Sequence, residues 1–152
     1  MGREIRKVPA NWEHPKNERG HYQPLYDESF REAATTWTRG FLQWAPGFPE
    51  FDKHGTDAPF YWQWEGNPPQ EDLYRPEWME AERTHFQVYE TVSEGTPVSP
   101  VLPSKDAVVA WAMEQGHSRA NAEAFAEDGY VPSGMFVPGR GLVVGIDAAG
   151  IR

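Results

Sequence analysis

Apolar side chains recur at helical spacing in three places along the chain. Between residues 29 and 44 they fall three, four and seven positions apart, and Ser29 with Glu32 has the spacing of a capping box. Two further helices are predicted at 105–115 and 119–128, because each begins after a serine that can cap it and ends before a glycine. The pattern therefore predicts three helices with defined ends.

Strict alternation of apolar and polar residues predicts short strands. One is expected at 59–65, where Trp62 and Trp64 would share a face, and a second at 84–92. A hairpin is expected at 135–144, around a Pro-Gly-Arg-Gly turn. These strands and helices alternate irregularly, which is typical of an α+β protein.

The remaining stretches set the expected organisation of the chain. Residues 1–26 lack periodicity and contain three prolines, so we expect an extended N-terminal arm. Residues 27–80 combine a helix with a region rich in proline and aromatic residues, and 84–152 hold a strand, an αα-hairpin and the terminal β-hairpin. We expect a single domain over 1–152, with a small mixed or antiparallel sheet of about 3–4 strands, about three helices and long ordered loops.

Composition narrows the class of protein. Aromatic residues make up 14% of the chain, with seven tryptophans, which argues against a disordered chain despite a mean hydropathy of −0.71. Cysteine is absent, which excludes disulfides, thiolate catalysis and cysteine-ligated metals. No apolar run approaches the ~18 residues of a membrane span, and the first residues lack the apolar core of a signal peptide. We expect a cytoplasmic protein without membrane contact.

Negative charge is concentrated in the middle of the sequence. The net charge is −9, and residues 21–100 hold fourteen acidic and five basic residues. Phosphate backbones bind lysine and arginine, so direct nucleic-acid binding is disfavoured. The charge suits a partner with a basic surface; the alternative interpretation, which is favoured for any excess of surface charge, is that it serves solubility.

The sequence contains no recognisable catalytic motif. A nucleophile elbow, a phosphate loop and a dinucleotide fingerprint are all missing. The two helices after residue 104 have the outline of a helix-turn-helix, but Glu123, Glu127 and Asp128 on the second helix would face phosphates. We interpret the pair as an αα-hairpin packed on a sheet, and the chain as more plausibly a binding protein than an enzyme.

One loop offers a weak candidate for a metal site. Asp52, His54 and Asp57 are close in sequence and have suitable ligand types. An acidic chain provides many such combinations, so we interpret these residues as exposed loop residues and expect no metal or other cofactor.

Aromatic residues are the strongest candidates for a binding site, because Trp and Tyr concentrate binding energy at interfaces. The candidate residues are Trp12, His14, Trp62, Trp64, Glu65 and Tyr74. The alternative is that a chain poor in Leu and Ile builds its core from rings, and for any single ring this alternative is favoured.

Two sequence motifs carry a resemblance to known proteins: NWEHP at 11–15 and YETVSEGTPVSP at 89–100. Together with Trp111, 129–133 and 145–146, they resemble a family of small uncharacterised proteins encoded by tailed phages and prophages. The likeness is less clear over the proline-rich middle of the chain. It implies an accessory phage protein, and because the family has no assigned activity, the resemblance assigns no catalytic residue.

Three functions follow as hypotheses. The first is a non-catalytic acidic module that binds a host or defence-system protein. Such a module could act as an anti-defence inhibitor. The alternative is a small-ligand-binding protein or small enzyme whose pocket combines Trp12 and His14 with Trp62 and Trp64. The third is a virion or assembly component. The partner and the oligomeric state do not follow from the sequence.

Overall fold

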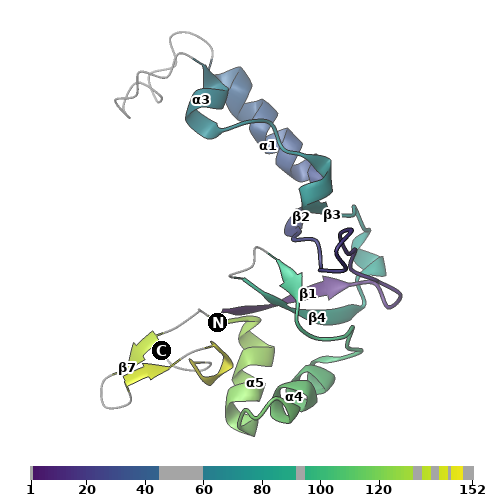
Figure 1. Cartoon of the computed structure of the whole chain (residues 1–152), viewed down its shortest axis with the longest axis vertical. Coiled ribbons are helices and arrows are strands. Elements are labelled where there is room, and N and C mark those ends of the chain that lie inside the picture. Colours follow the sequence, from purple (N-terminus) through teal and green to yellow (C-terminus); the bar gives the residue numbers. More distant parts are fainter. Residues whose placement is uncertain are drawn as a thin grey trace. The chain divides into compact units, whose positions relative to one another are not determined.

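The computed structural model describes residues 2–44, 60–91, 95–131, 135–137, 141–143 and 145–148. The chain divides into two compact units (Figure 1): a larger unit of Met1–Leu25 with Trp78–Arg152, and a smaller unit of Tyr26–Glu77. The two units have different architectures, and the single domain expected from the sequence stays a prediction.

A four-stranded antiparallel sheet forms the centre of the larger unit. Its strand order is β5-β4-β1-β6. The bounds are Arg3–Val8 for β1, His85–Glu90 for β4, Thr96–Pro97 for β5 and Tyr130–Val131 for β6. The register of the two central strands pairs Ile5 with Val88 and Arg6 with Gln87. The α+β class and the strand predicted at 84–92 are confirmed.

Two helices of the larger unit, α4 (Lys105–Glu114) and α5 (Arg119–Asp128), form an αα-hairpin. The hydroxyl of each N-cap serine, Ser104 and Ser118, accepts a hydrogen bond from the backbone N–H three residues on. Gly129 ends α5 in the left-handed region, with φ +76°. Both predicted helices are confirmed. They are predictable because the residues that cap each helix are close to it in sequence.

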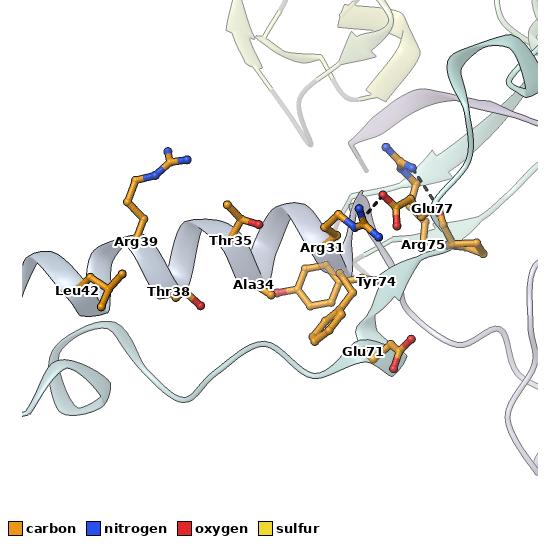
Figure 2. Close-up of a pocket in the computed structure, with 12 residues that line it drawn as sticks. Arg31, Ala34, Thr35, Thr38, Arg39, Leu42, Glu71, Tyr74, Arg75 and Glu77 are labelled. Atoms are coloured by element: carbon orange, nitrogen blue, oxygen red, sulfur yellow. Dashed lines mark hydrogen bonds and ion pairs between the residues drawn. The ribbon is translucent and has the colours of Figure 1, made fainter.

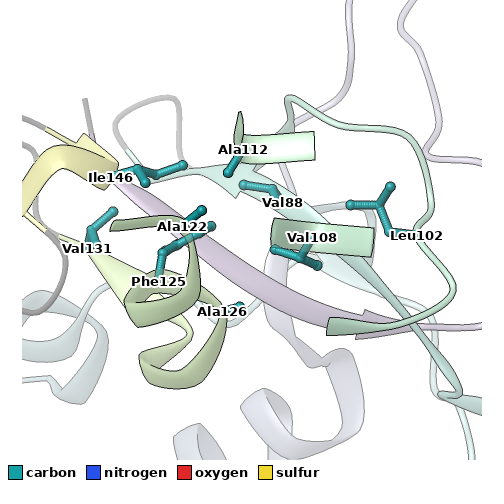
Figure 3. Packing of buried hydrophobic residues seen from close by; sticks show 9 residues of the cluster. All are labelled: Val88, Leu102, Val108, Ala112, Ala122, Phe125, Ala126, Val131 and Ile146. Atoms are coloured by element: carbon teal, nitrogen blue, oxygen red, sulfur yellow. The ribbon is translucent and has the colours of Figure 1, made fainter. Parts of the chain in front are cut away.

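The apolar core of the larger unit lies between this helix pair and one face of the sheet. It consists of nine buried residues, shown in Figure 3: Val88, Leu102, Val108, Ala112, Ala122, Phe125, Ala126, Val131 and Ile146. Ile5 and Phe86 pack against them from the two central strands. The helix pair is therefore a packed αα-hairpin, as predicted.

The C-terminal hairpin is also present. β7 (Met135–Val137) pairs with β8 (Gly141–Val143) in antiparallel register. The 3-10 helix η3 (Gly145–Ala148) follows, and its Ile146 belongs to the core. This end of the chain is thereby tied to the helix pair.

The N-terminal segment contains a strand that the sequence pattern does not predict. We expected an extended N-terminal arm over 1–26, and within it Arg3–Val8 forms β1, which lies in the centre of the sheet. Four of its six residues are charged, which hides the alternation. Arg6 is nevertheless buried, because the second face of the sheet is covered as well.

The smaller unit is built on one long helix, α1 (Phe30–Gln43), and the predicted capping box at its start is confirmed. The Ser29 hydroxyl accepts a hydrogen bond from the Glu32 backbone N–H (3.3 Å), and the Glu32 carboxylate accepts one from the Ser29 N–H (3.1 Å). Immediately before it, β2 (Tyr26–Ser29) pairs in parallel with β3 (Tyr74–Arg75).

A short helix, α3 (Tyr61–Glu65), occupies the place where a strand was expected at 59–65, so that prediction is wrong. Residues two apart share a face in a strand but point about 200° apart in a helix. Trp62 is accordingly exposed and Trp64 half-buried. The buried ring is Tyr61, which packs against α1.

Short 3-10 helices lie between the longer elements: η1 (Glu71–Leu73) in the smaller unit and η2 (Glu80–Glu82) in the larger. Within the part of the chain that the structure describes, no helix has the combination of length and hydrophobicity that a membrane span needs. Residues 45–59 of the proline-rich region lie outside the described residues.

Candidate functional site

The six candidate binding residues belong to two different units. Trp12 and His14 lie in the larger unit, whereas Trp62, Trp64, Glu65 and Tyr74 lie in the smaller unit. The pocket expected from the sequence, which combines Trp12 and His14 with Trp62 and Trp64, stays a prediction. So does the role of the six residues in binding.

His14 is held in a buried polar network on the second face of the larger unit's sheet. Its Nε2 lies 2.5 Å from the carbonyl oxygen of Gln23, so Nε2 carries a proton and donates. Its Nδ1 lies 2.9 Å from the hydroxyl oxygen of Tyr89. The Trp12 indole N–H donates to that same hydroxyl oxygen at 3.1 Å. These contacts attach residues 12–23 to β4.

Burial sets the protonation state of this imidazole. Desolvation lowers the pKa of His14 below its ordinary value of 6.5; the hydrogen bond to the Gln23 carbonyl opposes this effect, and Arg6 adds to it. With His14 neutral, its Nδ1 (2.9 Å) and the Gln87 side-chain oxygen (3.0 Å) compete for the single Tyr89 hydroxyl proton. Both ring nitrogens thus have hydrogen-bonding partners within the protein.

The network continues across the sheet and explains why polar side chains are buried there. The Gln87 amide donates to the Ser99 carbonyl at 2.9 Å, and the Ser99 hydroxyl accepts from the Val88 N–H at 2.8 Å. The Ser99 hydroxyl also donates to the Pro100 carbonyl at 2.8 Å. These bonds satisfy polar groups whose burial would otherwise be costly.

A cavity of about 820 Å³ lies beside this network. Its walls combine rings and prolines, among them Trp12, Tyr22 and Pro97, with charged side chains such as Glu13 and Lys16. Such a volume is within the range of small-ligand sites. The cavity therefore offers aromatic surface together with charged and polar groups.

In the smaller unit, aromatic rings join the two helices. The Tyr61 ring of α3 meets Trp37 (centroids 5.1 Å apart), Phe41 (6.2 Å) and Trp44 (5.9 Å), and Trp44 stacks on Trp64 at 6.1 Å. Burial raises the pKa of Tyr61, with Glu65 adding to the shift. Trp64 thereby has a packing role, as the core interpretation of the rings expects.

Other rings of the same helices face solvent. Phe60 and Trp62 stack face to face, with centroids 4.6 Å apart and planes 4° apart, although their exposed fractions are 48% and 43%. Phe41 is 42% exposed, and Glu65 is also exposed. A stacked pair held open to water is a preformed apolar surface.

Tyr74 lies apart from these rings, against Tyr26 (5.3 Å) and Phe30 (6.3 Å). Desolvation raises its pKa, with Glu28 and Tyr26 adding to the shift. It lines a groove along α1, shown in Figure 2. No sequence pattern indicates this groove, because its walls come from two segments that are remote in sequence, 30–42 and 71–77.

The two units differ in net charge. The smaller unit contains ten acidic and four basic residues, a net charge of −6, whereas the larger contains thirteen acidic and ten basic residues, a net charge of −3. The exposed rings of Phe60 and Trp62 therefore belong to the more acidic unit.

The described residues hold no cluster of three or more His, Asp or Glu side chains suited to a metal ion. The Asp52, His54 and Asp57 group lies outside the described residues. Comparison with protein-family models, with curated proteins and with solved structures found no match to this chain.

Proposed function

We propose that this chain is a non-catalytic protein-binding module that docks on a basic surface of its partner. The observation that carries the proposal is the stacked pair of Phe60 and Trp62, which stays about half exposed on a unit of net charge −6. Burying such rings is how interfaces gain most of their affinity.

Order in this pair reduces the cost of binding. Two rings already stacked lose little rotational freedom when a partner covers them, so more of the hydrophobic gain appears as affinity. Negative charge on the same unit attracts a basic surface and speeds encounter, especially at low salt. The rings thus contribute mainly to affinity, and the negative charge contributes mainly to the rate of association.

The source of the partner rests on the resemblance to phage-encoded proteins. An accessory phage protein acts in the cytoplasm of an infected bacterium, so the partner would be a host or defence-system protein. Inhibition of a defence protein by occlusion needs only tight binding, which agrees with the internally occupied His14 and Ser99.

Affinity capture with the full chain tests this function. Lysate of a bacterium that carries related prophages is passed over the immobilised chain at 50–500 mM salt, and a retained protein is purified and titrated against it. We expect a dissociation constant that rises with salt. Retention of no protein, or affinity indifferent to salt, would contradict the proposal.

Variants at exposed rings make the test specific. The double variant Phe60→Ala, Trp62→Ala is expected to weaken binding by about 100-fold, since truncating hot-spot residues costs ~2 kcal/mol or more. Tyr130→Ala is the control, because Tyr130 is 56% exposed on β6 of the larger unit. Equal losses for both variants would show that ring exposure alone does not define the docking face.

The cavity beside His14 supports a second candidate, a site for a small apolar ligand. Its volume of about 820 Å³ and its walls of rings and prolines suit a flat or aromatic molecule. A thermal-shift screen of aromatic compounds tests this, with Tyr22→Ala as the variant that opens the wall. A ligand that stabilises both proteins equally does not bind there.

A further inference from the structure

Every basic residue that the structure describes in the smaller unit lines one groove. These residues are Arg31 and Arg39 on α1 and Arg75 at the end of β3. The groove encloses about 1040 Å³. Three guanidinium groups gathered in a unit of net charge −6 form a local exception to its acidity.

The groove follows α1 along two neighbouring ridges. Ala34, Thr38 and Leu42 are four residues apart and form one ridge, in which the apolar side chain of Leu42 is 67% exposed. Thr35 and Arg39 lie on the adjacent ridge. Figure 2 shows Thr35 and Arg39 pointing to one side of the helix, and Thr38 and Leu42 to the other. The face therefore combines exposed apolar surface with a positive margin.

The three arginines differ in how firmly they are held. Arg75 is mostly buried and pairs with Asp27 at 3.0 Å. Arg31 pairs with Glu77 at 3.2 Å, but both side chains are more than half exposed, so this pair is weak and can exchange. The side chain of Arg39 has no ion pair or hydrogen bond among the described residues. Two guanidinium groups are thus available to an incoming anion.

We propose that this groove binds an acidic peptide segment of a partner protein, with one carboxylate at Arg39, another at Arg31 and an apolar side chain between them. Arg31 and Arg39 are eight residues apart on a helix, which is about 12 Å along the axis. In an extended peptide, side chains four residues apart lie about 13 Å apart on one face. The expected motif is therefore two acidic residues at positions i and i+4.

This spacing is why a peptide fits better than a small anion. One phosphate reaches a single guanidinium across such a gap, and Glu71 and Glu77 in the groove walls disfavour a concentrated negative charge. Singly charged carboxylates, spread along a chain, meet the two arginines separately. Neither Phe60 nor Trp62 lines this groove, so the proposal stands independently of the aromatic docking face.

Synthetic heptapeptides test the motif by fluorescence anisotropy with the full chain at low salt. One peptide has Glu at positions 2 and 6 with Leu at 4, and the others replace both Glu residues with Gln, replace both with Lys, or move the second Glu to position 4. We expect the first to bind at least about tenfold more tightly than the Gln peptide, since each exposed ion pair contributes up to ~1 kcal/mol. Similar affinities for all four would overturn the proposal.

Variants of the protein locate the binding site. Arg39→Ala is expected to weaken binding of the first peptide roughly three- to fivefold, Arg39→Lys to retain most of the affinity, and Arg119→Ala in the larger unit to leave it unchanged. An unchanged affinity for Arg39→Ala would overturn the proposal. So would displacement of the peptide by submillimolar inorganic phosphate, or self-association of the chain that Arg39→Ala abolishes, because the occupant would then be a simple anion or a second copy.

Discussion

The ring of Tyr61 lies directly against the backbone of Gly40, in the middle of α1. A Cβ atom added at Gly40 would stand 2.7 Å from Tyr61 Cζ and closer still to the hydroxyl oxygen. Glycine, which weakens a helix interior, is therefore required here by the close approach of α3. From the sequence alone, Gly40 would be expected to lower the stability of the helix.

Gly40→Ala is expected to destabilise the smaller unit by about 1–3 kcal/mol, because overpacking outweighs the gain in helix propensity. Chemical unfolding followed by tryptophan fluorescence measures this, since Trp37 and Trp44 adjoin Tyr61.

In a Tyr61→Ala background the same substitution should stabilise the protein by about 0.5–1 kcal/mol, because the obstructing ring is gone and only helix propensity remains. A change of the same sign in both backgrounds would contradict the role assigned to this contact.

Gly129→Ala tests a glycine that is required for a different reason. Its φ is +76°, and a Cβ there would meet no atom within 4 Å. The expected cost is about 1–2 kcal/mol, arising only from the backbone conformation. Gly129→Asn should restore part of it, because Asn tolerates the left-handed region better. An equal cost for both substitutions would point to steric contact instead.

An element of this fold is predictable from the sequence when the residues that determine it are close together in the chain. The capped helices α1, α4 and α5 are predictable, since serine, glutamate and glycine act on residues within one turn. β1 is not, because its partner β4 is remote in sequence and its Arg6 is buried under a polar layer. Local patterns cannot indicate such a layer.

The candidate site residues likewise depend on partners that are remote in sequence. Alternating rings at Trp62 and Trp64 predict a strand, but the side chain that decides the structure is Tyr61, whose partner Gly40 lies on another helix. Trp12 and His14 were identified as candidates from their residue types, and only the structure brings them to Tyr89. The arginine groove has no sequence signal, since Arg75 joins α1 through the parallel pairing of β2 and β3.

His14 makes stability depend on pH. Its pKa is lowered in the folded protein, so the unfolded chain takes up its proton first, near pH 6.5. The contribution of neutral His14 is complete above that pH and is lost as the pH falls toward the lowered folded pKa. The slope from this one proton reaches at most about 1.4 kcal/mol per pH unit.

Urea unfolding between pH 8 and pH 5.5 measures this dependence. His14→Gln should flatten it over the same interval, whereas His21→Gln, at an exposed position, should follow the original protein. Identical slopes for His14→Gln and the original chain would show that burial of this imidazole is not the cause.

Arg6 is a buried residue of β1 that connects this strand to the chain segment ending at Leu25. Its guanidinium donates to the Leu25 carbonyl at 2.7 Å, lies 2.7 Å from the Glu4 carboxylate and stands 4.2 Å from the centre of the Tyr89 ring. Arg6→Ala is expected to cost about 3 kcal/mol, since it leaves the carbonyl without its donor and removes packing over the ring. Arg6→Lys should cost about half as much, because an ammonium cannot reach both oxygen atoms as a fork.

Unfolding in urea at neutral pH compares these variants with Arg119→Ala. Arg119 forms an ion pair at 3.3 Å with Glu123, and both side chains are more than half exposed. Its removal should change the free energy of unfolding by less than about 0.5 kcal/mol, because water replaces an exposed pair at little cost. If Arg6→Ala were as mild as Arg119→Ala, the second face of the sheet would not depend on this cation. The hydrogen bonds of His14 and Tyr89, together with that from the Leu25 N–H to the Gly95 carbonyl, would then suffice to hold residues 12–25 in place.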